Sequence, residues 1–512
     1  MLNRDQTYQD LYREFAWALP GRLNLAEQTV WHWAKRAPDR TAILDVNAGQ
    51  VHPVPYGQLA AMTASLAGQL KAIGVQQGNR VGVLRSQDPW CAAAHAAIWQ
   101  IGAISVPLFK LFREDALASR IQDAGCQKVI TDDDGAELLG NLATPVIPER
   151  GFVGDPSTKI AKTSPETPAI LIYTSGTTGK PKGALHGHRI LAGHLPGVEM
   201  SHDFLGADDD ILWTPADWAW IGGLFDVLMP GLALGVPVVA ARMPRFDVAA
   251  CSELIDQTGI RNVFFPPTAL RMLKAEGARI NGLRTVASGG EPLGAEMLNW
   301  GRKSLGVTIN EFYGQTECNM VASSCQSLFP PRPGGIGRPV PGFDVQVIDD
   351  AGHPTADEGD IAIRKGPASM MLHYWNNPQA TAEKFRGDWL LTGDRGRMED
   401  GFVYFKGRED DVITSGGYRI GPAEIEDCLL THPGVATVGV VGKPDPLRTE
   451  IVKAYVVRKP GATVTAEDLQ THVKLRLAAY SYPREITFLD ALPMTVTGKV
   501  IRKDLKARAA KE

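Results

Sequence analysis

The stretch YTSGTTGKPKG, Tyr173 to Gly183, is the most distinctive sequence in this 512-residue chain. It follows the apolar segment AILI and combines three glycines, four hydroxyl side chains and two lysines in eleven residues. Glycines let backbone N–H groups approach a phosphate closely, hydroxyls add donors, and lysines neutralise charge. A Walker A loop needs Ser or Thr after its lysine, but Pro181 follows Lys180. The stretch therefore predicts a phosphate-binding loop of another kind after a buried strand, rather than a flexible surface turn.

Helix and strand patterns alternate on both sides of this loop. Apolar residues at spacings of three and four predict one helix face, with Gly74 as its stop: Leu59, Met62, Leu66, Leu70 and Ile73. Short apolar segments that predict buried strands recur along the chain: RVGVLRS (80–86), ISVPLF (104–109), VVAAR (238–242), NVFFPP (262–267), TVASGG (285–290) and VTINEF (307–312). This alternation predicts an α/β fold in which helices cover parallel strands.

Composition excludes several classes of protein. A net charge of -4 argues against a dedicated nucleic-acid binder, since such domains are usually basic. The six cysteines form no CxxC pair, which favours reduced thiols over a disulfide framework. The first residues are mixed in charge and lack an apolar signal core. Polar residues interrupt the apolar stretches at 91–109 and 225–241, so no membrane span is expected and a cytoplasmic protein is predicted.

The charge distribution suggests two domains. Residues 412–512 carry 15 Lys and Arg against 11 Asp and Glu, a net charge of +4, whereas the whole chain carries -4. A small basic module on a larger acidic body could hold a phosphate-rich ligand between them, although random scatter of charge is an alternative. We place the boundary in the charged stretch KGREDD, residues 406–411. The predicted division is an N-terminal domain over 1–408, a hinge over 409–411 and a C-terminal domain over 412–512.

Further motifs follow the loop in a fixed order: WTPADWAWIGG (213–223), SGGEPL (288–293), NEFYGQTEC (310–318), LTGDRG (391–396), GREDDVITSGGYRIGPAEIE (407–426) and PMTVTGKVIRKDL (493–505). Together with YTSGTTGKPKG they resemble the acyl-adenylate-forming superfamily of AMP-binding enzymes, and within it short- and medium-chain acyl-CoA synthetases. The resemblance covers nearly the whole chain. It implies a large N-terminal α/β domain with several sheets and a small mobile α+β C-terminal domain. It also implies an ATP-dependent acid:CoA ligase that works through an acyl-AMP and uses ATP, Mg²⁺ and coenzyme A.

The resemblance assigns the nucleotide to a large set of residues: Thr174, Ser175, Gly176, Thr177, Thr178, Gly179, Lys180, Gly290, Glu291, Pro292, Tyr313, Gly314, Gln315, Asp394, Arg408 and Arg419. Asp394 would accept hydrogen bonds from both ribose hydroxyls, a donor pair that suits a carboxylate. Tyr313 would stack on the adenine, with the Gly290–Pro292 backbone on its other face. Arg408 and Arg419 would contact ribose and phosphates.

Three residues would take part in the reaction. Glu317 would bind Mg²⁺, a hard cation that prefers oxygen ligands, and Thr316 would touch the phosphates. Lys499 would reach the substrate carboxylate and the α-phosphate. No protein nucleophile is needed, because positioning and charge neutralisation suffice for attack at phosphorus. Metal binding by His186 and His188, which flank Gly187, is the less favoured interpretation of that pair.

The same resemblance places the acyl pocket, the coenzyme A contacts and the hinge. The pocket would be lined by Trp220, Ile221, Gly222, Gly289 and Gly314. Acetate-specific relatives carry tryptophan where this chain has Gly314, so we expect an open tunnel and an acid longer than acetate, which points to a medium-chain fatty or related acid. Coenzyme A would pass Gly416, Gly417 and Tyr418, and the hinge would lie at Asp410.

Three other functions remain open from the sequence. One is an adenylating enzyme that loads a carrier protein, although the chain ends soon after the lysine segment. Another is a luciferase-like oxygenase. The last is a non-catalytic nucleotide sensor, which would not need Lys499, Asp394 and Glu317 together. The spacing PxxxxGK from Pro493 to Lys499 resembles a site read by protein acetyltransferases, so an acetyltransferase acting on Lys499 is a predicted partner.

Overall fold

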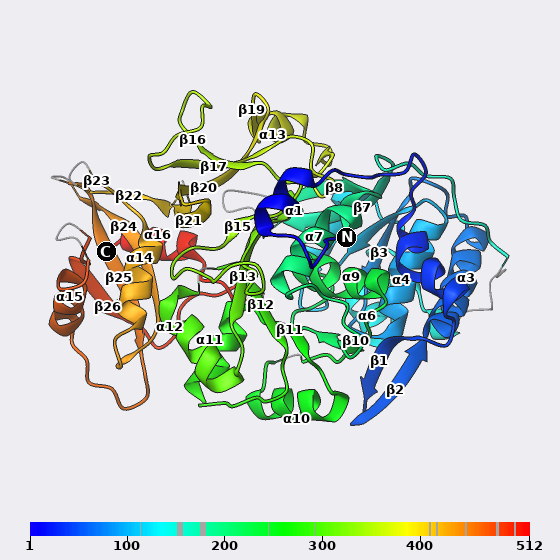
Figure 1. The fold of residues 1–512 in the computed structure, drawn as a ribbon, viewed down its shortest axis with the longest axis horizontal. Helices are drawn as coiled ribbons and strands as arrows, with labels where there is room; N and C mark the ends of the chain where they lie inside the picture. The colour runs from blue at the N-terminus through cyan, green and yellow to red at the C-terminus, as the bar shows by residue number, and fades with distance from the viewer. Residues whose placement is uncertain are drawn as a thin grey trace.

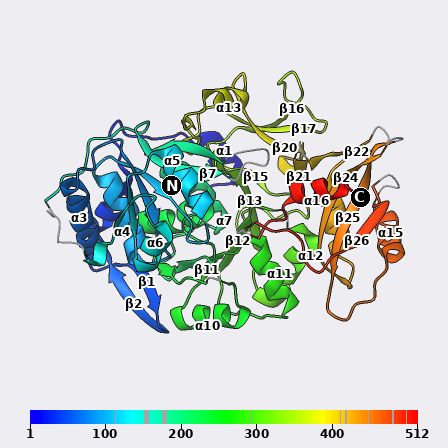
Figure 2. The same ribbon diagram turned by 180° about the vertical axis from the view of Figure 1, so that it is seen from behind.

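Four β-sheets with surrounding helices make up the protein (Figure 1). The computed structural model describes residues 1–112, 114–150, 157–174, 181–243, 245–291, 293–408, 411–415, 418–445, 448–477, 481–495 and 498–512, and the architecture given below is that of these residues. In both views of this elongated molecule, α3 (Tyr56–Ala72) lies at one end and the last sheet at the other, while α1 (Tyr8–Glu14) lies near the middle (Figures 1 and 2).

The sheet that flanks the loop has seven described strands in the order β18-β8-β7-β4-β3-β5-β6. Their bounds are β3 Arg80–Leu84, β4 Ile104–Pro107, β5 Lys128–Thr131, β6 Thr144–Val146, β7 Pro168–Thr174, β8 Lys182–Gly187 and β18 His373–Tyr374. Strands β3 to β7 are parallel, whereas β8 and β18 join antiparallel at one side. The loop thus connects two neighbouring strands, β7 and β8, and its ends pair with each other.

A second sheet carries most of the other motifs. Its nine described strands have the order β15-β14-β13-β12-β11-β9-β10-β1-β2. Their bounds are β1 Thr41–Asn47, β2 Gln50–Pro55, β9 Leu212–Trp213, β10 Val238–Ala240, β11 Asn262–Phe264, β12 Thr285–Gly289, β13 Ile309–Gln315, β14 Cys318–Ser323 and β15 Arg338–Pro339. The strands from β1 through β10, β9, β11 and β12 to β13 are parallel, as the alternating pattern predicts.

Two smaller sheets complete the chain. The third is antiparallel, with β16 Val345–Ile348, β17 Gly359–Arg364, β19 Phe385–Arg386, β20 Trp389–Glu399 and β21 Phe402–Arg408. The fourth lies beyond residue 412, with β22 Ile413–Ser415, β23 Tyr418–Ile420, β24 Val435–Asp445, β25 Thr449–Arg458 and β26 Glu485–Phe488. The long β24–β25 hairpin is antiparallel, and β26 joins β25 in parallel.

Helices cover these sheets. The described helices are α1 Tyr8–Glu14, α2 His32–Arg36, α3 Tyr56–Ala72, α4 Pro89–Gln100, α5 Glu114–Ala124, α6 Asp133–Leu139, α7 Ile190–Ser201, α8 Ile221–Gly223, α9 Met229–Leu234, α10 Val248–Thr258, α11 Pro267–Ala275, α12 Gly294–Trp300, α13 Pro378–Glu383, α14 Pro422–Leu430, α15 Ala466–Lys474 and α16 Arg502–Ala509. Short π-helical or 3₁₀ turns are η1 Glu27–Trp31, η2 Pro148–Arg150, η3 Leu224–Leu228 and η4 Gly301–Leu305.

Local signals explain where several helices start and stop. Asp88 caps α4 by accepting a hydrogen bond from the Cys91 backbone N–H, and Pro89 at the first turn needs no such partner. In α3, Leu59, Leu66 and Leu70 are buried as their spacing predicts. Ile73 is also on the predicted apolar face, but it forms the C-cap and is 38 % exposed. The buried face of α3 therefore ends at Leu70.

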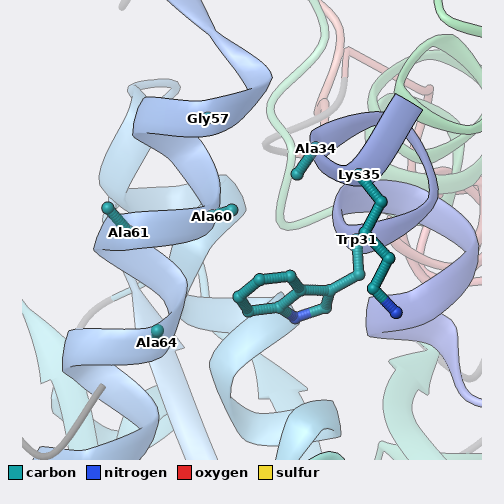
Figure 3. A pocket seen from close by; sticks show the side chains of 7 residues that line it. All are labelled: Trp31, Ala34, Lys35, Gly57, Ala60, Ala61 and Ala64. Carbon is teal, nitrogen blue, oxygen red and sulfur yellow. The ribbon is translucent and has the colours of Figure 1, made fainter. Parts of the chain in front are cut away.

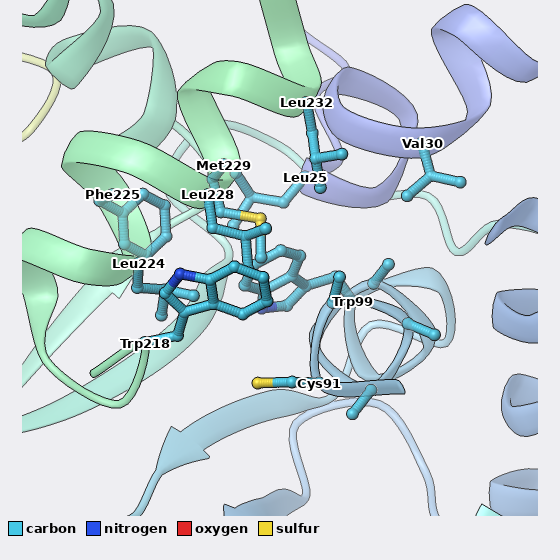
Figure 4. Packing of buried hydrophobic residues seen from close by; sticks show 14 of the residues in the cluster. Leu25, Val30, Cys91, Trp99, Trp218, Leu224, Phe225, Leu228, Met229 and Leu232 are labelled. Carbon is cyan, nitrogen blue, oxygen red and sulfur yellow. The ribbon is translucent and has the colours of Figure 1, made fainter. Parts of the chain in front are cut away.

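The largest core lies between the first two sheets and their helices. Trp99 from α4 and Trp218, which precedes α8, are buried beside Leu224, Phe225 and the rest of η3 (Figure 4). The motif WTPADWAWIGG is therefore anchored in this core. Packing on both sides fixes the backbone of the proposed acyl-pocket segment.

Three further observations concern the rest of the fold: a surface hollow, the cysteines and the length of the helices. A shallow apolar hollow of about 370 Å³ separates Trp31 and Ala34 from the Gly57–Ala64 side of α3 (Figure 3). All six cysteines lie buried in the described part of the chain and form no disulfide there, in agreement with reduced thiols. Among the described helices, none combines the length and apolarity that crossing a membrane requires.

Candidate active site

The ends of the predicted phosphate loop lie at the edge of the seven-stranded sheet. Thr174 ends β7 and faces Lys182 on β8, and the Thr174 hydroxyl donates to the Lys182 carbonyl at 3.4 Å. The Lys182 Nζ lies 5.5 Å from the centroid of the Tyr374 ring. Ser175, Gly176, Thr177, Thr178, Gly179 and Lys180 lie outside the described residues, so their phosphate contacts stay a prediction.

The structure brings the predicted ribose acid together with the end of β13. The Tyr313 hydroxyl donates to Asp394 Oδ2 at 2.5 Å, and Gln315 Nε2 donates to the same oxygen at 3.1 Å. Arg408 ends β21, faces Asp394 on β20 in register, and forms an ion pair at 3.7 Å from its NH1 to Asp394 Oδ1. One carboxylate thus connects the second sheet with the third.

Burial and nearby charges act in opposite directions on this carboxylate. Burial raises the pKa of Asp394, whereas Arg408 and the hydrogen bond from Tyr313 lower it. Burial, together with Asp394, raises the pKa of the Tyr313 hydroxyl well above its ordinary value, so Tyr313 remains a donor. A carboxylate with one oxygen directed away from its two donors can accept hydrogen bonds from the hydroxyl pair of a ribose.

Glu317, the predicted magnesium ligand, lies in the turn between β13 and β14 and is 8 % exposed. The Tyr374 hydroxyl donates to Glu317 Oε1, and the Met371 N–H donates to the Glu317 carbonyl at 2.7 Å. These contacts hold the residue beside β8, the strand after the loop. Among the described residues no hydrogen bond is formed to Glu317 Oε2, so this oxygen could bind a cation.

The donor chemistry at this position suits Mg²⁺. The described residues contain no group of three or more His, Cys, Asp or Glu side chains that could hold a metal ion. Mg²⁺ is commonly bound through only one or two carboxylates plus substrate phosphates, so a single glutamate fits that pattern. His186 and His188 are buried, and burial lowers the pKa of each to about 3, which makes both neutral at pH 7.

Lys499 reaches the N-terminal motifs from the last segment of the chain. Its Nζ lies 5.9 Å from the Trp220 ring centroid and beside the backbone of Gly290. Gly498 has φ of +79° and packs against Thr268, so a glycine at this turn lets the lysine segment approach α11 closely. Burial lowers the pKa of Lys499, and Glu291 and Asp394 oppose that effect.

The acyl-pocket residues lie against a row of aromatic rings. The Trp220 and Phe264 centroids are 5.9 Å apart, and those of Phe264 and Phe312 are 5.2 Å apart. A Cβ added to Gly222 would lie 2.8 Å from the Trp220 ring, and one added to Gly289 would lie 2.6 Å from the Phe312 ring. These two glycines therefore leave space that the rings fill.

The sequence predicts an open tunnel beside Gly314, but the space in its Cβ direction is occupied. A Cβ at this position would lie 2.1 Å from Asn319 Oδ1 and 2.5 Å from the Met320 N. Asn319 is fixed because its Nδ2 donates to both oxygens of buried Asp226, at 2.9 and 3.0 Å. Along its Cβ direction Gly314 thus faces a packed amide, and the preference for longer acids stays a prediction.

Other predicted site residues cannot be placed. Pro292, the hinge residue Asp410, and the coenzyme A residues Gly416 and Gly417 lie outside the described residues. Tyr418 and Arg419 lie on β23, but the structure does not describe their side chains. Thr316 lies between β13 and β14, next to Glu317.

Sequence reasoning missed several residues that line the site. Tyr374 and Lys384 come from the segment HYWNNPQATAEKF, residues 373–385, which lies between recognised motifs. Lys384 Nζ donates to Gln315 Oε1 at 3.0 Å and to the Thr392 carbonyl at 3.3 Å. Asp226 had one detectable signal, a charge within an apolar stretch. A lone lysine or tyrosine offers no such signal, because most are solvated or in the core.

Comparison with known proteins identifies the family. Residues 30–375 match the AMP-binding enzyme family, and residues 424–499 match the AMP-binding enzyme C-terminal domain. Acetyl-coenzyme A synthetase of Bacillus subtilis is 31% identical, over 98% of this chain and 95% of that protein. The mitochondrial acyl-coenzyme A synthetase ACSM3 of Mus musculus is also 31% identical, over 98% and 93%. The anthranilate CoA ligase AuaEII, solved with anthranoyl-AMP, superposes with a TM-score of 0.86 at 26% identity, over 96% of this chain and 98% of that one.

The chain belongs to the AMP-binding enzyme family, and the two relatives named above are acyl-CoA synthetases. The resemblance drawn from the motifs is confirmed, and so is the fold class with a large α/β part and a smaller C-terminal part. The protein is accordingly a ligase of the acyl-CoA synthetase class, whose substrates and cofactors are ATP, Mg²⁺ and coenzyme A.

Proposed function

We propose that this enzyme, an ATP-dependent acid:CoA ligase, activates a medium-chain fatty or related acid. The observation that carries the ligase activity is the convergence of Asp394, Tyr313 and Gln315 from two sheets. Lys499 also reaches this region, beside Gly290. The ACSM3 relative is named an acyl-coenzyme A synthetase, which is in keeping with an acid beyond acetate.

Two successive steps follow from this arrangement. The substrate carboxylate oxygen attacks the α-phosphorus of ATP, and the bond to pyrophosphate breaks. The thiol sulfur of coenzyme A then attacks the acyl carbonyl, loses its proton and displaces AMP. Bound magnesium supplies charge neutralisation on the phosphates. The chain supplies position and fixed charge: Asp394 binds the ribose hydroxyls, Tyr313 stacks on adenine, and Lys499 contacts the carboxylate and α-phosphate.

We also propose the division into residues 1–408, a hinge at 409–411 and residues 412–512. In the proposed first step Lys499 lies at the substrate carboxylate and the α-phosphate. The lysine must then move away before coenzyme A can reach the acyl carbonyl. A rotation of the C-terminal domain about Asp410 achieves this and brings Gly416, Gly417 and Tyr418 to the coenzyme A path. Asp410→Pro fixes one φ angle and should slow the thioester step far more than adenylation. Equal slowing of both steps would contradict the hinge.

Two cellular proposals accompany this assignment. The protein acts in the cytoplasm, and a protein acetyltransferase silences it at Lys499, since acetylation removes the charge that adenylation uses. Stoichiometric acetylation of Lys499 should abolish acid-dependent pyrophosphate release. Full activity of the acetylated protein would contradict this regulation.

A panel of acids tests the central assignment. Pyrophosphate release should require ATP, Mg²⁺ and an added acid, and AMP release should then require coenzyme A. Straight-chain acids from two to ten carbons, with branched and aromatic acids beside them, locate the preferred substrate. Pyrophosphate release without any acid, or acyl transfer only to a carrier protein, would reject the proposed activity.

A further inference from the structure

Lys384 occupies an unusual place at the nucleotide motifs. It is the C-cap of α13, and Asn377 caps the other end of that short helix. The Lys384 carbonyl accepts from the Leu391 N–H at 2.8 Å, which ties its backbone to β20 beside Thr392. The side chain is partly buried, and its ammonium group points to Gln315 rather than to solvent.

The ammonium group decides which way the Gln315 amide faces. A lysine ammonium has three donors and no acceptor, so only the oxygen of the amide can turn toward it. Lys384 Nζ lies 3.0 Å from Gln315 Oε1. The amide nitrogen must then face the other way, where Gln315 Nε2 donates to the Thr392 carbonyl at 2.6 Å and to Asp394 Oδ2 at 3.1 Å. A reversed amide would place an acceptor against the carboxylate.

With the Gln315 amide in this orientation, both donors bind Oδ2 of Asp394, and Oδ1 is left to accept from a ligand. Oδ2 accepts from both Tyr313 and Gln315, whereas Oδ1 has the Arg408 ion pair at 3.7 Å. Burial is the largest influence on the pKa of Lys384 and lowers it, Glu317 and Asp394 oppose that effect, and Arg408 and Lys182 add to it.

We propose that Lys384 is a positioning residue for the ribose, acting through Gln315 to fix the carboxylate of Asp394. The inference rests on the proposed role of Asp394 as the acceptor for the ribose hydroxyls. Lys384 need not touch the nucleotide. It makes Asp394 a better-ordered acceptor, so its effect depends on the hydroxyls that Asp394 binds.

Deoxynucleotides separate this role from a general one. Affinities for ATP, 2′-deoxy-ATP and 3′-deoxy-ATP are measured by calorimetry with Mg²⁺ and no acid, so no turnover is required. Wild-type protein should bind each deoxy analogue roughly tenfold more weakly than ATP, the scale of a hydrogen bond to a charged group. In Lys384→Met, ATP should lose both hydroxyl contacts and weaken roughly a hundredfold, whereas each analogue, which keeps one hydroxyl, should weaken roughly tenfold, so the discrimination disappears.

Matched variants complete the test. Lys384→Arg keeps a cation with only donors and should retain most of the discrimination. Lys365→Met is the control, because Lys365 Nζ also donates to a carbonyl, that of Gly387, in the same region but outside the site. If Lys384→Met is unfolded at the assay temperature, Lys384→Gln replaces it, since its side chain is one atom shorter and uncharged. The same loss of discrimination is then expected.

The outcomes distinguish the inference from its foundation. If the wild-type protein does not discriminate against the deoxy analogues, the ribose role of Asp394 itself is wrong. If the wild-type protein discriminates and Lys384→Met weakens all three nucleotides equally, or leaves all three unchanged, Asp394 keeps its role and the positioning role of Lys384 is rejected. Loss of discrimination in Lys365→Met as well would also reject it, because the effect would not be specific to Lys384.

Discussion

The hydroxyl of Tyr374 donates a hydrogen bond to Oε1 of Glu317, although 57 residues separate them. Tyr374 lies on β18, which pairs with β8, the strand that follows the predicted phosphate loop. The contact therefore fixes the proposed magnesium ligand relative to the loop that would hold the phosphates. Loss of a residue that orients a metal ligand in this way commonly lowers metal affinity or activity by roughly 10–100-fold.

Tyr374→Phe should weaken magnesium binding. Removing the hydroxyl frees Glu317 to turn, and the Mg²⁺ concentration for half-maximal pyrophosphate release should rise about tenfold. Binding of Mn²⁺ in the presence of ATP, followed by electron paramagnetic resonance, should weaken in parallel. Tyr12→Phe is the control, because the Tyr12 hydroxyl donates to the Phe343 carbonyl at 2.9 Å, outside the site. Unchanged metal affinity in Tyr374→Phe would show that Glu317 is not the ligand or needs no orientation.

Lys499→Ala should separate the two half-reactions. Adenylate formation should fall by at least about a hundredfold, because a preorganised cation at the reacting phosphate is lost. Thioester formation from supplied acyl-AMP should stay within about threefold of wild type, since that step does not use the lysine. Single-turnover measurements of each step decide the matter, with the exposed Lys503→Ala as control. Equal loss in both steps would contradict the assigned role.

The pH dependence of adenylation should reflect the lowered pKa of Lys499. Burial lowers this pKa, and Arg408 acts in the same direction, while Glu291 and Asp394 oppose them. The ammonium charge is present below this pKa and is lost as pH rises through it. Adenylation should therefore decline on an alkaline limb that lies below the ordinary lysine pKa of about 10.4.

Lys499→Arg gives the matched comparison for that limb. Arginine stays charged throughout the range, so the activity that remains should lack the decline. Tyr313 does not contribute to this alkaline decline, because its pKa is raised well above the ordinary value. The same alkaline limb in Lys499→Arg would assign the titration to another group.

Chain length should control the rate until the pocket is filled. Each methylene buried in an apolar pocket contributes about 0.8 kcal/mol, so kcat/KM should rise roughly fourfold per added carbon beyond acetate. Phe264→Ala removes the middle ring of the aromatic row and should move the optimum to longer acids. Phe246→Ala, from a different cluster, should leave the optimum unchanged. Acetate as the best substrate of the wild-type enzyme would contradict a medium-chain preference.

The sequence predicts some of these features far better than others. Regular spacing predicts α3, because one buried face repeats every three or four residues. The family resemblance carried by the motifs implies that Tyr313 and Asp394 belong to one site. Their mutual hydrogen bond depends on how the second and third sheets meet, which no local pattern encodes. Lys384 is harder still, since its role depends on the orientation of the Gln315 amide.

Gly314 shows what the sequence alone cannot specify about the proposed acyl pocket. Its small size is visible in the sequence, but the direction of the missing side chain is not. The sequence predicts a tunnel beyond this glycine, and the structure adds that a Cβ at Gly314 would meet Asn319. A tryptophan at this position would therefore clash with Asn319, and this clash would disturb the local packing whatever the side chain did to the acyl pocket.

Gly314→Ala should thus destabilise the protein rather than merely narrow the pocket. The added methyl group would meet both the Asn319 side chain and the Met320 backbone, and relaxing such overpacking costs about 1–3 kcal/mol. Asn319 cannot move freely, because its amide donates to Asp226, which is itself held by a hydrogen bond from His194 Nδ1 at 2.9 Å. The melting temperature should fall by several degrees, and activity should fall for short and long acids alike. Gly21→Ala is the control, since a Cβ there meets no atom within 4 Å. A stable Gly314→Ala enzyme that loses only long acids would show instead that this glycine lines the acyl tunnel.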